Sequence, residues 1–257
     1  MDLQPRRYRL RHPAIDVWSA GDGPTVALLH GWGLSGRPYR PAIRALAGLG
    51  YRVVAPSVAV VDGGWTMQRL SDVAADALFA MDVAEAITVG HSFGGALGLR
   101  LAVDHPDLVR SLILVDSFAV SPGRRALVRI ALPGAHWRVG MSGPTALALA
   151  ASATREGGLR SLARSARWVL RRSMDEEAAA IRDRAVPAAV LWAERDTLLP
   201  LSLGARTAEA LGASLEVIPT HPPGWTSPRG LDHDWPTRAP AFFADRLDAT
   251  VRRLNPS

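Results

Sequence analysis

Short apolar runs alternate with segments of helical periodicity along most of the chain, and this alternation restricts the fold more than any other feature. The apolar runs have the length of buried strands, and the segments between them place their apolar residues on one helical face. Such alternation is typical of a mostly parallel sheet with helices on both faces. We expect its strands at 25–30, 51–56, 86–90, 110–117, 186–194 and 214–219.

Two earlier strand-like segments, 8–11 and 15–20, are expected to pair as an antiparallel hairpin. The expected helices cover 40–50, 66–81, 93–105 and 203–212, and a last helix begins at about residue 236. The alternation stops between 117 and 186, where helical pieces are separated by turn sequences. The sequence therefore predicts an α/β core formed by residues 1–116 and 187–257, with residues 117–186 inserted as a helical lid.

Composition excludes several classes of protein. The chain has no cysteine, so disulfides, thiolate metal sites and cysteine nucleophiles are excluded. All 30 basic residues are arginine and the net charge is +6, but no nucleic-acid-binding motif accompanies this charge. We expect no nucleic acid partner and no membrane span, since no apolar stretch is long enough. The charged start lacks the apolar segment of a signal peptide, which favours a cytoplasmic location.

The segment ITVGHSFGG, residues 87–95, places one serine at the joint between an expected strand and an expected helix. A serine hydroxyl becomes a good nucleophile when a base removes its proton and the developing oxyanion is stabilised. A tight strand-to-helix turn exposes Ser92 beside the free N–H groups of the helix N-terminus, and it crowds the positions of Gly90 and Gly94. The segment predicts a nucleophile, although a serine that caps a helix in a glycine-rich loop would look the same locally.

The sequence Gly-x-Ser-x-Gly between a buried strand and a helix resembles the nucleophile elbow of the α/β-hydrolase superfamily. The loop LLHGWG, residues 28–33, is also similar to the family's His-Gly loop after an earlier strand. The resemblance covers essentially the whole chain and implies the α/β-hydrolase fold. It also implies an oxyanion hole formed by the backbone amides of Trp32 and Phe93, whereas His30 is expected to hold the loop.

The resemblance implies a Ser-acid-His order for the catalytic residues. Asp196 lies just past a buried strand, in the family's usual place for the acid, and it can also serve as a helix cap. Asp116 is a rival at the end of the preceding strand, and Glu194 stands two residues too early. For the base, His233 resembles the family's histidine, with a proline and a phenylalanine following at the family's spacing. We expect His221 to be an exposed loop residue.

The expected reaction is ester hydrolysis by Ser92, His233 and Asp196, with no metal or cofactor implied. Thioester hydrolysis, acyl transfer, lactone opening, carbon–carbon hydrolysis and peroxidation use the same triad and stay open, as does a non-catalytic ligand receptor on this fold. The segments 57–67 and 219–232 depart from the family's usual loops, so the substrate cannot be taken from a relative. An unperturbed histidine as base would predict activity that falls below about pH 6.5.

The expected lid is rich in arginine. Between residues 121 and 172 there are ten arginines and one acid, Glu156. Four of the arginines recur at helical spacing and share one face of a helix. They are Arg160, Arg164, Arg167 and Arg171. Apolar residues occupy another face of this helix, which could point to the site, and Trp137 and Trp168 could line the acyl pocket. The face is either solvated or a docking surface for an anionic acyl carrier, such as acyl carrier protein or coenzyme A. The methyl esterase of biotin synthesis, which has a similar His-Gly-Trp-Gly loop, acts on such a carrier.

Overall fold

The computed structural model describes residues 3–8, 15–58, 65–117, 119–120, 154, 158–169 and 171–255. They form one sheet of eight strands in the order β1-β2-β4-β3-β5-β6-β7-β8. β1 pairs antiparallel with β2, and β2 pairs antiparallel with β4, whereas all other neighbours are parallel. The strands are β1 (Arg6–Tyr8), β2 (Ile15–Ala20), β3 (Thr25–Leu29), β4 (Arg52–Pro56), β5 (Ala86–His91), β6 (Val109–Val115), β7 (Ala188–Ala193) and β8 (Ser214–Ile218).

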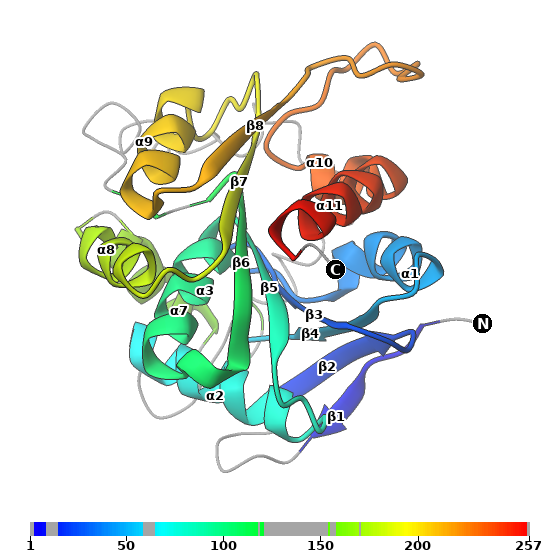
Figure 1. The fold of residues 1–257 in the computed structure, drawn as a ribbon. Helices are drawn as coiled ribbons and strands as arrows, with labels where there is room; N and C mark the ends of the chain where they lie inside the picture. Colours follow the sequence, from blue (N-terminus) through cyan, green and yellow to red (C-terminus); the bar gives the residue numbers. More distant parts are fainter. Residues whose placement is uncertain are drawn as a thin grey trace.

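Helices cover both faces of this sheet (Figure 1). On one face α1 (Arg40–Gly48) packs against α11 (Pro240–Leu254), and the short helix η1 (Arg37–Tyr39) leads into α1. The other face carries α2, α3, α8 and α9, with α3 packed between α2 and α8. Their bounds are α2 (Met67–Phe79), α3 (Phe93–Asp104), α8 (Asp175–Asp183) and α9 (Leu201–Leu211). The class expected from the sequence, a mostly parallel sheet between two layers of helices, is confirmed.

The strand pattern explains why the sheet needs both layers. Successive side chains of a strand point to opposite faces, so an apolar run such as TVALL buries residues on each side. Leu29 packs in the core beneath α2 and α3, whereas its neighbour Leu28 packs in the core beneath α1 and α11. Both side chains are fully buried. A sheet of such strands is stable only when helices cover both faces.

Local signals set several helix ends. The Thr66 hydroxyl accepts a hydrogen bond from the backbone N–H of Arg69 at 3.1 Å and so caps the N-terminus of α2. α9 ends at Gly212, which has a φ of +61° that glycine adopts without a steric cost. The expected final helix is divided, because α10 (Trp235–Arg238) ends at Ala239 before Pro240 begins α11. Proline favours a helix start at that point, since it has no N–H to donate to the preceding turn.

The predicted insertion is described only in part. Its described helices are α7 (Gly158–Val169) and α8. Ala178 and Ile181 of α8 are fully buried in the core against α3 and α9, so this end of the insertion contributes to the main domain. Trp137 and most of the segment before α7 lie outside the described residues. The lid therefore stays a prediction.

No helix in the described ranges is both long enough and apolar enough to cross a membrane.

Candidate active site

The turn between β5 and α3 holds Ser92 in a conformation that its neighbours make possible. Ser92 has a φ of +54°, where residues with a side chain are rare. The backbone around this turn is closely packed. If Gly90 had a Cβ atom, that atom would lie 2.6 Å from Gly95 Cα, and a Cβ atom on Gly94 would lie 2.8 Å from the carbonyl oxygen of His30. A larger residue at either position would displace backbone. The two glycines therefore allow the tight turn that the sequence predicted.

Three side chains from distant parts of the chain are joined by hydrogen bonds in the site. His233 Nε2 lies 2.9 Å from Ser92 Oγ, and His233 Nδ1 lies 2.7 Å from Asp196 Oδ2. The Asp196 carboxylate accepts, so Nδ1 carries a proton, and in the neutral ring Nε2 is free to accept the proton of the serine hydroxyl. The geometry thus brings together the nucleophile, base and acid expected from the sequence. Their catalytic roles are a proposal, made below.

Asp196 is held in place by hydrogen bonds within its own turn, and the loop that carries it is bound by a second carboxylate, Asp232. Asp196 Oδ1 accepts hydrogen bonds from the backbone N–H groups of Leu198 and Leu199, at 2.8 and 2.6 Å, within the turn before α9. Asp196 is not a helix cap, because α9 begins at Leu201 with Pro200 as its N-cap. Asp232 Oδ1 accepts from the backbone N–H groups of Thr197 and His233, at 2.8 and 2.7 Å. Asp232 therefore ties the loop of the acid to the loop of the histidine.

The surroundings of His233 change its proton affinity. Burial disfavours the imidazolium, but the charge and hydrogen bond of Asp196, with smaller contributions from Asp116 and Asp234, outweigh burial and raise the pKa of His233 to about 9. The condition for activity that falls below about pH 6.5, an unperturbed pKa of the base, is therefore not met. The physical reason is that the hydrogen bond to Asp196 at 2.7 Å and the negative charges of Asp196, Asp116 and Asp234 together stabilise the protonated ring more strongly than burial destabilises it.

Asp116, the rival acid, lies at the end of β6 and binds other groups. Its Oδ1 accepts from the backbone N–H of Ala193 at 2.8 Å, and its Oδ2 accepts from the indole N–H of Trp235 at 2.6 Å. Burial and the nearby charge of Asp196 raise its pKa well above the usual value, whereas His233 and these two N–H donors lower it. Asp116 is thus bonded to β7 and to the start of α10, and His233 Nδ1 is bonded to Asp196.

The loop after β3 lies against the nucleophile. A Cβ built on Gly31 would lie 3.5 Å from Ser92 Cβ, which places Trp32 and its amide beside the start of α3, where Phe93 follows the serine. The first N–H groups of a helix have no partner within it and can hold an oxyanion. His30 bonds to the backbone of its own loop at Gly31 O (2.9 Å) and accepts from Val58 N of the loop after β4 (3.1 Å), which is consistent with a role in holding the loop.

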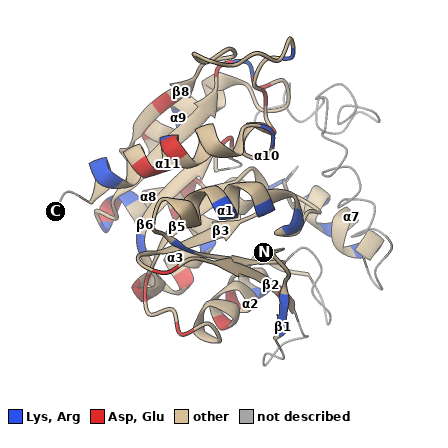
Figure 2. Cartoon of the chain, turned by 90° about the vertical axis from the view of Figure 1, so that its right-hand side faces the viewer, with Lys and Arg blue, Asp and Glu red and all other residues tan. Residues whose placement is uncertain are grey.

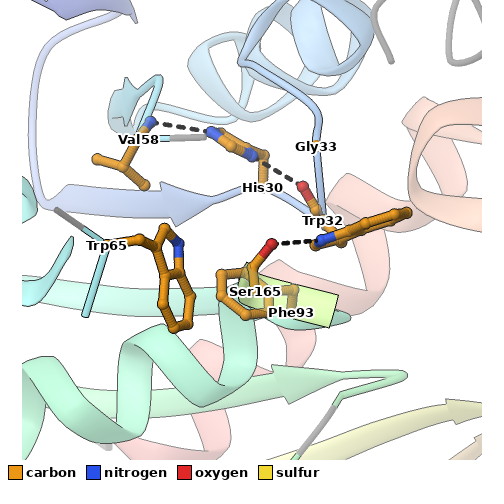
Figure 3. A pocket seen from close by; sticks show the side chains of 8 residues that line it. His30, Trp32, Gly33, Val58, Trp65, Phe93 and Ser165 are labelled. Atoms are coloured by element: carbon orange, nitrogen blue, oxygen red, sulfur yellow. Dashed lines mark hydrogen bonds between the residues drawn. The ribbon is translucent and has the colours of Figure 1, made fainter. Parts of the chain in front are cut away.

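A small cavity is lined by Trp32, Phe93 and residues around them (Figure 3). It has about 10 Å³ of space for the centre of a water molecule, which suits a single oxygen atom. The indole N–H of Trp32 donates to Ser165 Oγ of α7 at 2.7 Å and thereby connects the loop to the predicted lid. The cavity is lined by His30, Gly31, Trp32, Gly33, Val58, Trp65, Phe93 and Ser165.

Two of the weaker sequence candidates are not part of the hydrogen-bonded series of Ser92, His233 and Asp196. His221 is exposed in the loop after β8, as expected. Glu194 accepts hydrogen bonds from the backbone and the hydroxyl of Thr220, at 3.1 and 3.0 Å, and so fixes the start of that loop. These bonds, with the backbone bond the larger cause, lower the pKa of Glu194. Neither residue is hydrogen-bonded to Ser92.

Sequence reasoning missed Tyr39, His91, Asp232 and Ser165. Only His91 carried a local signal, as the residue before the nucleophile. Among the described residues, His91, Asp116 and His233 place potential metal-ligand atoms within 4.8 Å of one another. Each of those nitrogens and oxygens already has a hydrogen-bond partner in the protein, so a bound metal would have to replace those bonds.

Comparison with known proteins agrees with this architecture. A sequence model of the α/β-hydrolase fold matches residues 24–141. The chain is 36% identical over 103 residues to RutD of Yersinia enterocolitica, which carries the provisional name carbamate hydrolase, and the match covers 37% of each protein. It is 34% identical over 109 residues, 39% of each protein, to a 2-hydroxymuconate semialdehyde hydrolase of Pseudomonas putida. These matches thus span less than half the length of the relatives.

The likeness to solved structures extends over the whole fold. The structure of the N-acyl homoserine lactonase AidH with N-butanoyl homoserine superimposes with a TM-score of 0.77, covering 99% of this chain and 98% of the lactonase at 16% identity. A meta-cleavage product hydrolase, CumD, superimposes with a TM-score of 0.74 at 20% identity, covering 97% of this chain and 98% of CumD. The sequence model, the strand order and these superpositions agree. The chain therefore has the α/β-hydrolase fold.

Proposed function

We propose that the chain is a serine hydrolase that cleaves a carboxylic ester or thioester through an acyl-enzyme. The observation that carries this proposal is the hydrogen-bonded series from Ser92 through His233 to Asp196. It joins a nucleophile, a base with the correct nitrogen free, and a carboxylate that orients the base. We assign the oxyanion to the backbone amides of Trp32 and Phe93, two residues that line the small cavity.

The proposed reaction has two halves. Ser92 Oγ attacks the carbonyl carbon while His233 Nε2 takes the hydroxyl proton, and the amides of Trp32 and Phe93 donate to the negative oxygen. His233 then gives its proton to the leaving alcohol or thiol as the bond to the carbonyl carbon breaks. In the second half His233 takes a proton from water, the resulting hydroxide attacks the acyl-enzyme, and the proton returns to Ser92. Asp196 stabilises the imidazolium in both halves.

The relatives support hydrolysis in general and leave the bond open. Their names describe a carbamate hydrolase, a semialdehyde hydrolase and a lactonase. Acyl transfer, lactone opening and carbon–carbon hydrolysis use the same residues and are the alternatives within this chemistry. A ligand receptor without catalysis is the alternative of a different class, because a fold does not determine a function.

Aromatic side chains around Phe93, the residue after Ser92, are the best candidates for the acyl pocket. The rings of Trp65, Phe93 and Trp168 lie pairwise 6.0 to 6.3 Å apart and come from three different segments. Trp168 belongs to α7, whose Leu162 and Val169 are buried. The predicted lid would thus contribute an apolar inner face to the pocket, while α7 also carries exposed arginines (Figure 2).

The outer face of α7 is the proposed docking surface for an anionic acyl carrier. Arg160, Arg164 and Arg167 are exposed and make no ion pair with any residue in the described part of the chain. Their positive charges are therefore available to a phosphate or carboxylate partner. The carrier could be acyl carrier protein or coenzyme A, within the cytoplasm where the sequence leads us to place the protein.

Fluorophosphonate labelling with an ester panel tests the proposed function. We expect labelling of the wild-type protein at Ser92, hydrolysis of at least one acyl ester or thioester, and loss of both in Ser92→Ala, by up to about a millionfold in turnover. Ser111→Ala, which removes a buried hydroxyl of β6, is the matched control and should keep both. A wild-type protein that binds acyl ligands without labelling or turnover would support the receptor. Ser92→Ala with near wild-type turnover would refute the mechanism.

A further inference from the structure

A second hydrogen-bonded series runs through the site, and the proposed chemistry does not use it. The backbone N–H of Gly31 donates to Tyr39 Oη at 3.2 Å, and Tyr39 Oη lies 2.6 Å from His91 Nδ1. His91 Nε2 in turn lies 2.8 Å from the backbone carbonyl oxygen of His233. These residues are contributed by the loop after β3, by η1, by β5 and by the loop before α10.

The direction of this series follows from its two ends. The N–H of Gly31 can only donate and the carbonyl of His233 can only accept. His91 Nε2 must therefore carry a proton, and in the neutral ring Nδ1 must then accept the proton of the Tyr39 hydroxyl. Tyr39 Oη has a lone pair left for Gly31. Every member thus has one possible role, and the tautomer of His91 is determined by its neighbours.

Burial keeps the series neutral while the base next to it changes charge. Tyr39 is fully buried and His91 is 3% exposed. Burial, which outweighs the hydrogen bond from Gly31, raises the pKa of Tyr39 far above its usual value. Burial and the nearby charge of His233 lower the pKa of His91 to about 3, although its bond to His233 O opposes this. Neither residue changes its protonation between pH 5 and 9, so the series stays intact as His233 gains and loses its proton.

The two ends of the series lie at the two functional parts of the site. Gly31 directly precedes Trp32, a proposed oxyanion donor, and His233 is the proposed base. The rings of His91 and His233 have their centroids 5.1 Å apart, and those of Tyr39 and His91 lie 5.8 Å apart. A small shift at either end would change the position of a reacting group, and errors of about 1 Å in such positions can cost a hundredfold in rate.

We propose that Tyr39 and His91 are positioning residues that set the oxyanion loop and the backbone of His233 relative to each other. This inference rests on the proposed function of Ser92, His233 and Asp196. The competing explanation is that the two rings only fill space in the core. The two explanations differ for substitutions that keep the ring or the shape and remove the polar atoms.

Tyr39→Phe is the primary test, because it keeps the ring and removes the hydroxyl. We expect kcat and the rate of fluorophosphonate labelling to fall by about tenfold to a hundredfold, with KM within about twofold. Tyr51→Phe is the matched control, since it removes a buried hydroxyl bonded to Asp248 at 2.7 Å, away from the site. Labelling of Tyr39→Phe within twofold of wild type would overturn the inference.

Variants of His91 test the series without changing Tyr39. His91→Gln offers an amide oxygen that can accept and an N–H that can donate, whereas His91→Leu offers neither. We expect the Gln variant to be labelled at least about tenfold faster than the Leu variant, and Tyr39→Phe to add little to the loss in His91→Leu. Equal labelling of the Gln and Leu variants, both folded, would mean that His91 only fills space.

The tautomer of His91 is a readout that does not depend on activity. Nitrogen-15 NMR of the histidine rings should show His91 protonated at Nε2 alone from pH 5 to 9, and Tyr39→Phe should change this pattern. A proton on Nδ1 in the wild-type protein would overturn the inference. If the wild-type protein is not labelled by fluorophosphonate, the proposed function fails, and the tautomer measurement still decides whether the series exists.

Discussion

Replacing Asp196 with asparagine should abolish most of the activity by reversing the tautomer of His233. In the structure Oδ1 of Asp196 accepts from two backbone N–H groups, Leu198 and Leu199, while Oδ2 accepts from His233 Nδ1. An asparagine has only one acceptor oxygen. The two N–H groups require that oxygen at the Oδ1 position, which directs the NH₂ group at His233. The ring must then accept at Nδ1 and carry its proton on Nε2, where it cannot take the proton of Ser92.

The size of this effect follows from the same contacts. The asparagine could keep His233 in its active tautomer only by turning its oxygen to His233 Nδ1. Its NH₂ group would then point at the backbone N–H groups of Leu198 and Leu199 and leave both without an acceptor. Each buried unsatisfied donor costs about 1–3 kcal/mol, so this orientation is disfavoured by about 2–6 kcal/mol. At about 1.36 kcal/mol per factor of ten, the loss is roughly thirtyfold to twenty-thousandfold. Loss of the negative charge next to the imidazolium adds to it, so we expect kcat to fall about ten-thousandfold.

The assay is the turnover of a neutral ester, together with thermal unfolding to show that the variant is folded. Asp116→Asn is the matched control, because Asp116 is a buried carboxylate in the same site that binds Ala193 and Trp235. It should lose less than about tenfold in kcat, although the loss of one buried hydrogen bond should lower its stability by about 1–3 kcal/mol. A large loss only in Asp116→Asn would identify that residue as the acid. Equal losses would refute the tautomer reasoning.

The other predictions concern pH, the base and the arginines of α7. Because the pKa of His233 is raised to about 9, kcat/KM should rise with pH well above 6.5, as the protonated ring loses its proton and can act as a base; an inflection at or below pH 6.5 in a pH–rate profile would contradict this. His233→Ala should be inactive and His221→Ala should keep most of its turnover, and the reverse would move the base to the loop after β8. Three charge reversals on α7 should slow the turnover of carrier-bound acyl substrates and leave the hydrolysis of a small neutral ester unaffected. They are Arg160→Glu, Arg164→Glu and Arg167→Glu. Raised salt should give the same result in the wild-type protein, because salt screens exposed charges. Equal effects on both substrates would exclude docking on α7.

The sequence by itself determined the features that depend on local geometry. Apolar periodicity predicted the alternating strands and helices, because the side-chain repeat of each element is a property of its own backbone. The elbow was predictable for the same reason, since Gly90 and Gly94 are needed within five residues of one turn. The resemblance to a known family also implied an order of the catalytic residues along the chain, and this order helped to predict Asp196 as the acid and His233 as the base.

Only the tertiary structure decided between groups that look alike in sequence. Asp116 and Asp196 each follow a buried strand, and β6 and β7 are neighbours, so the two carboxylates reach the same site. Which of them bonds to His233 depends on the loop that carries each one. The pKa of His233 was likewise beyond the sequence, because it reflects a balance between burial and a carboxylate 37 positions away.

The series from Gly31 through Tyr39 and His91 to His233 shows the same limit most clearly. Its last bond joins residues 142 positions apart, and its members lie on four separate segments. No local pattern requires a tyrosine in η1 or a histidine before the nucleophile. Their roles arise because the sheet places the ends of β3 and β5 side by side, and because a buried polar atom must find its partner among whatever the fold brings within about 3 Å.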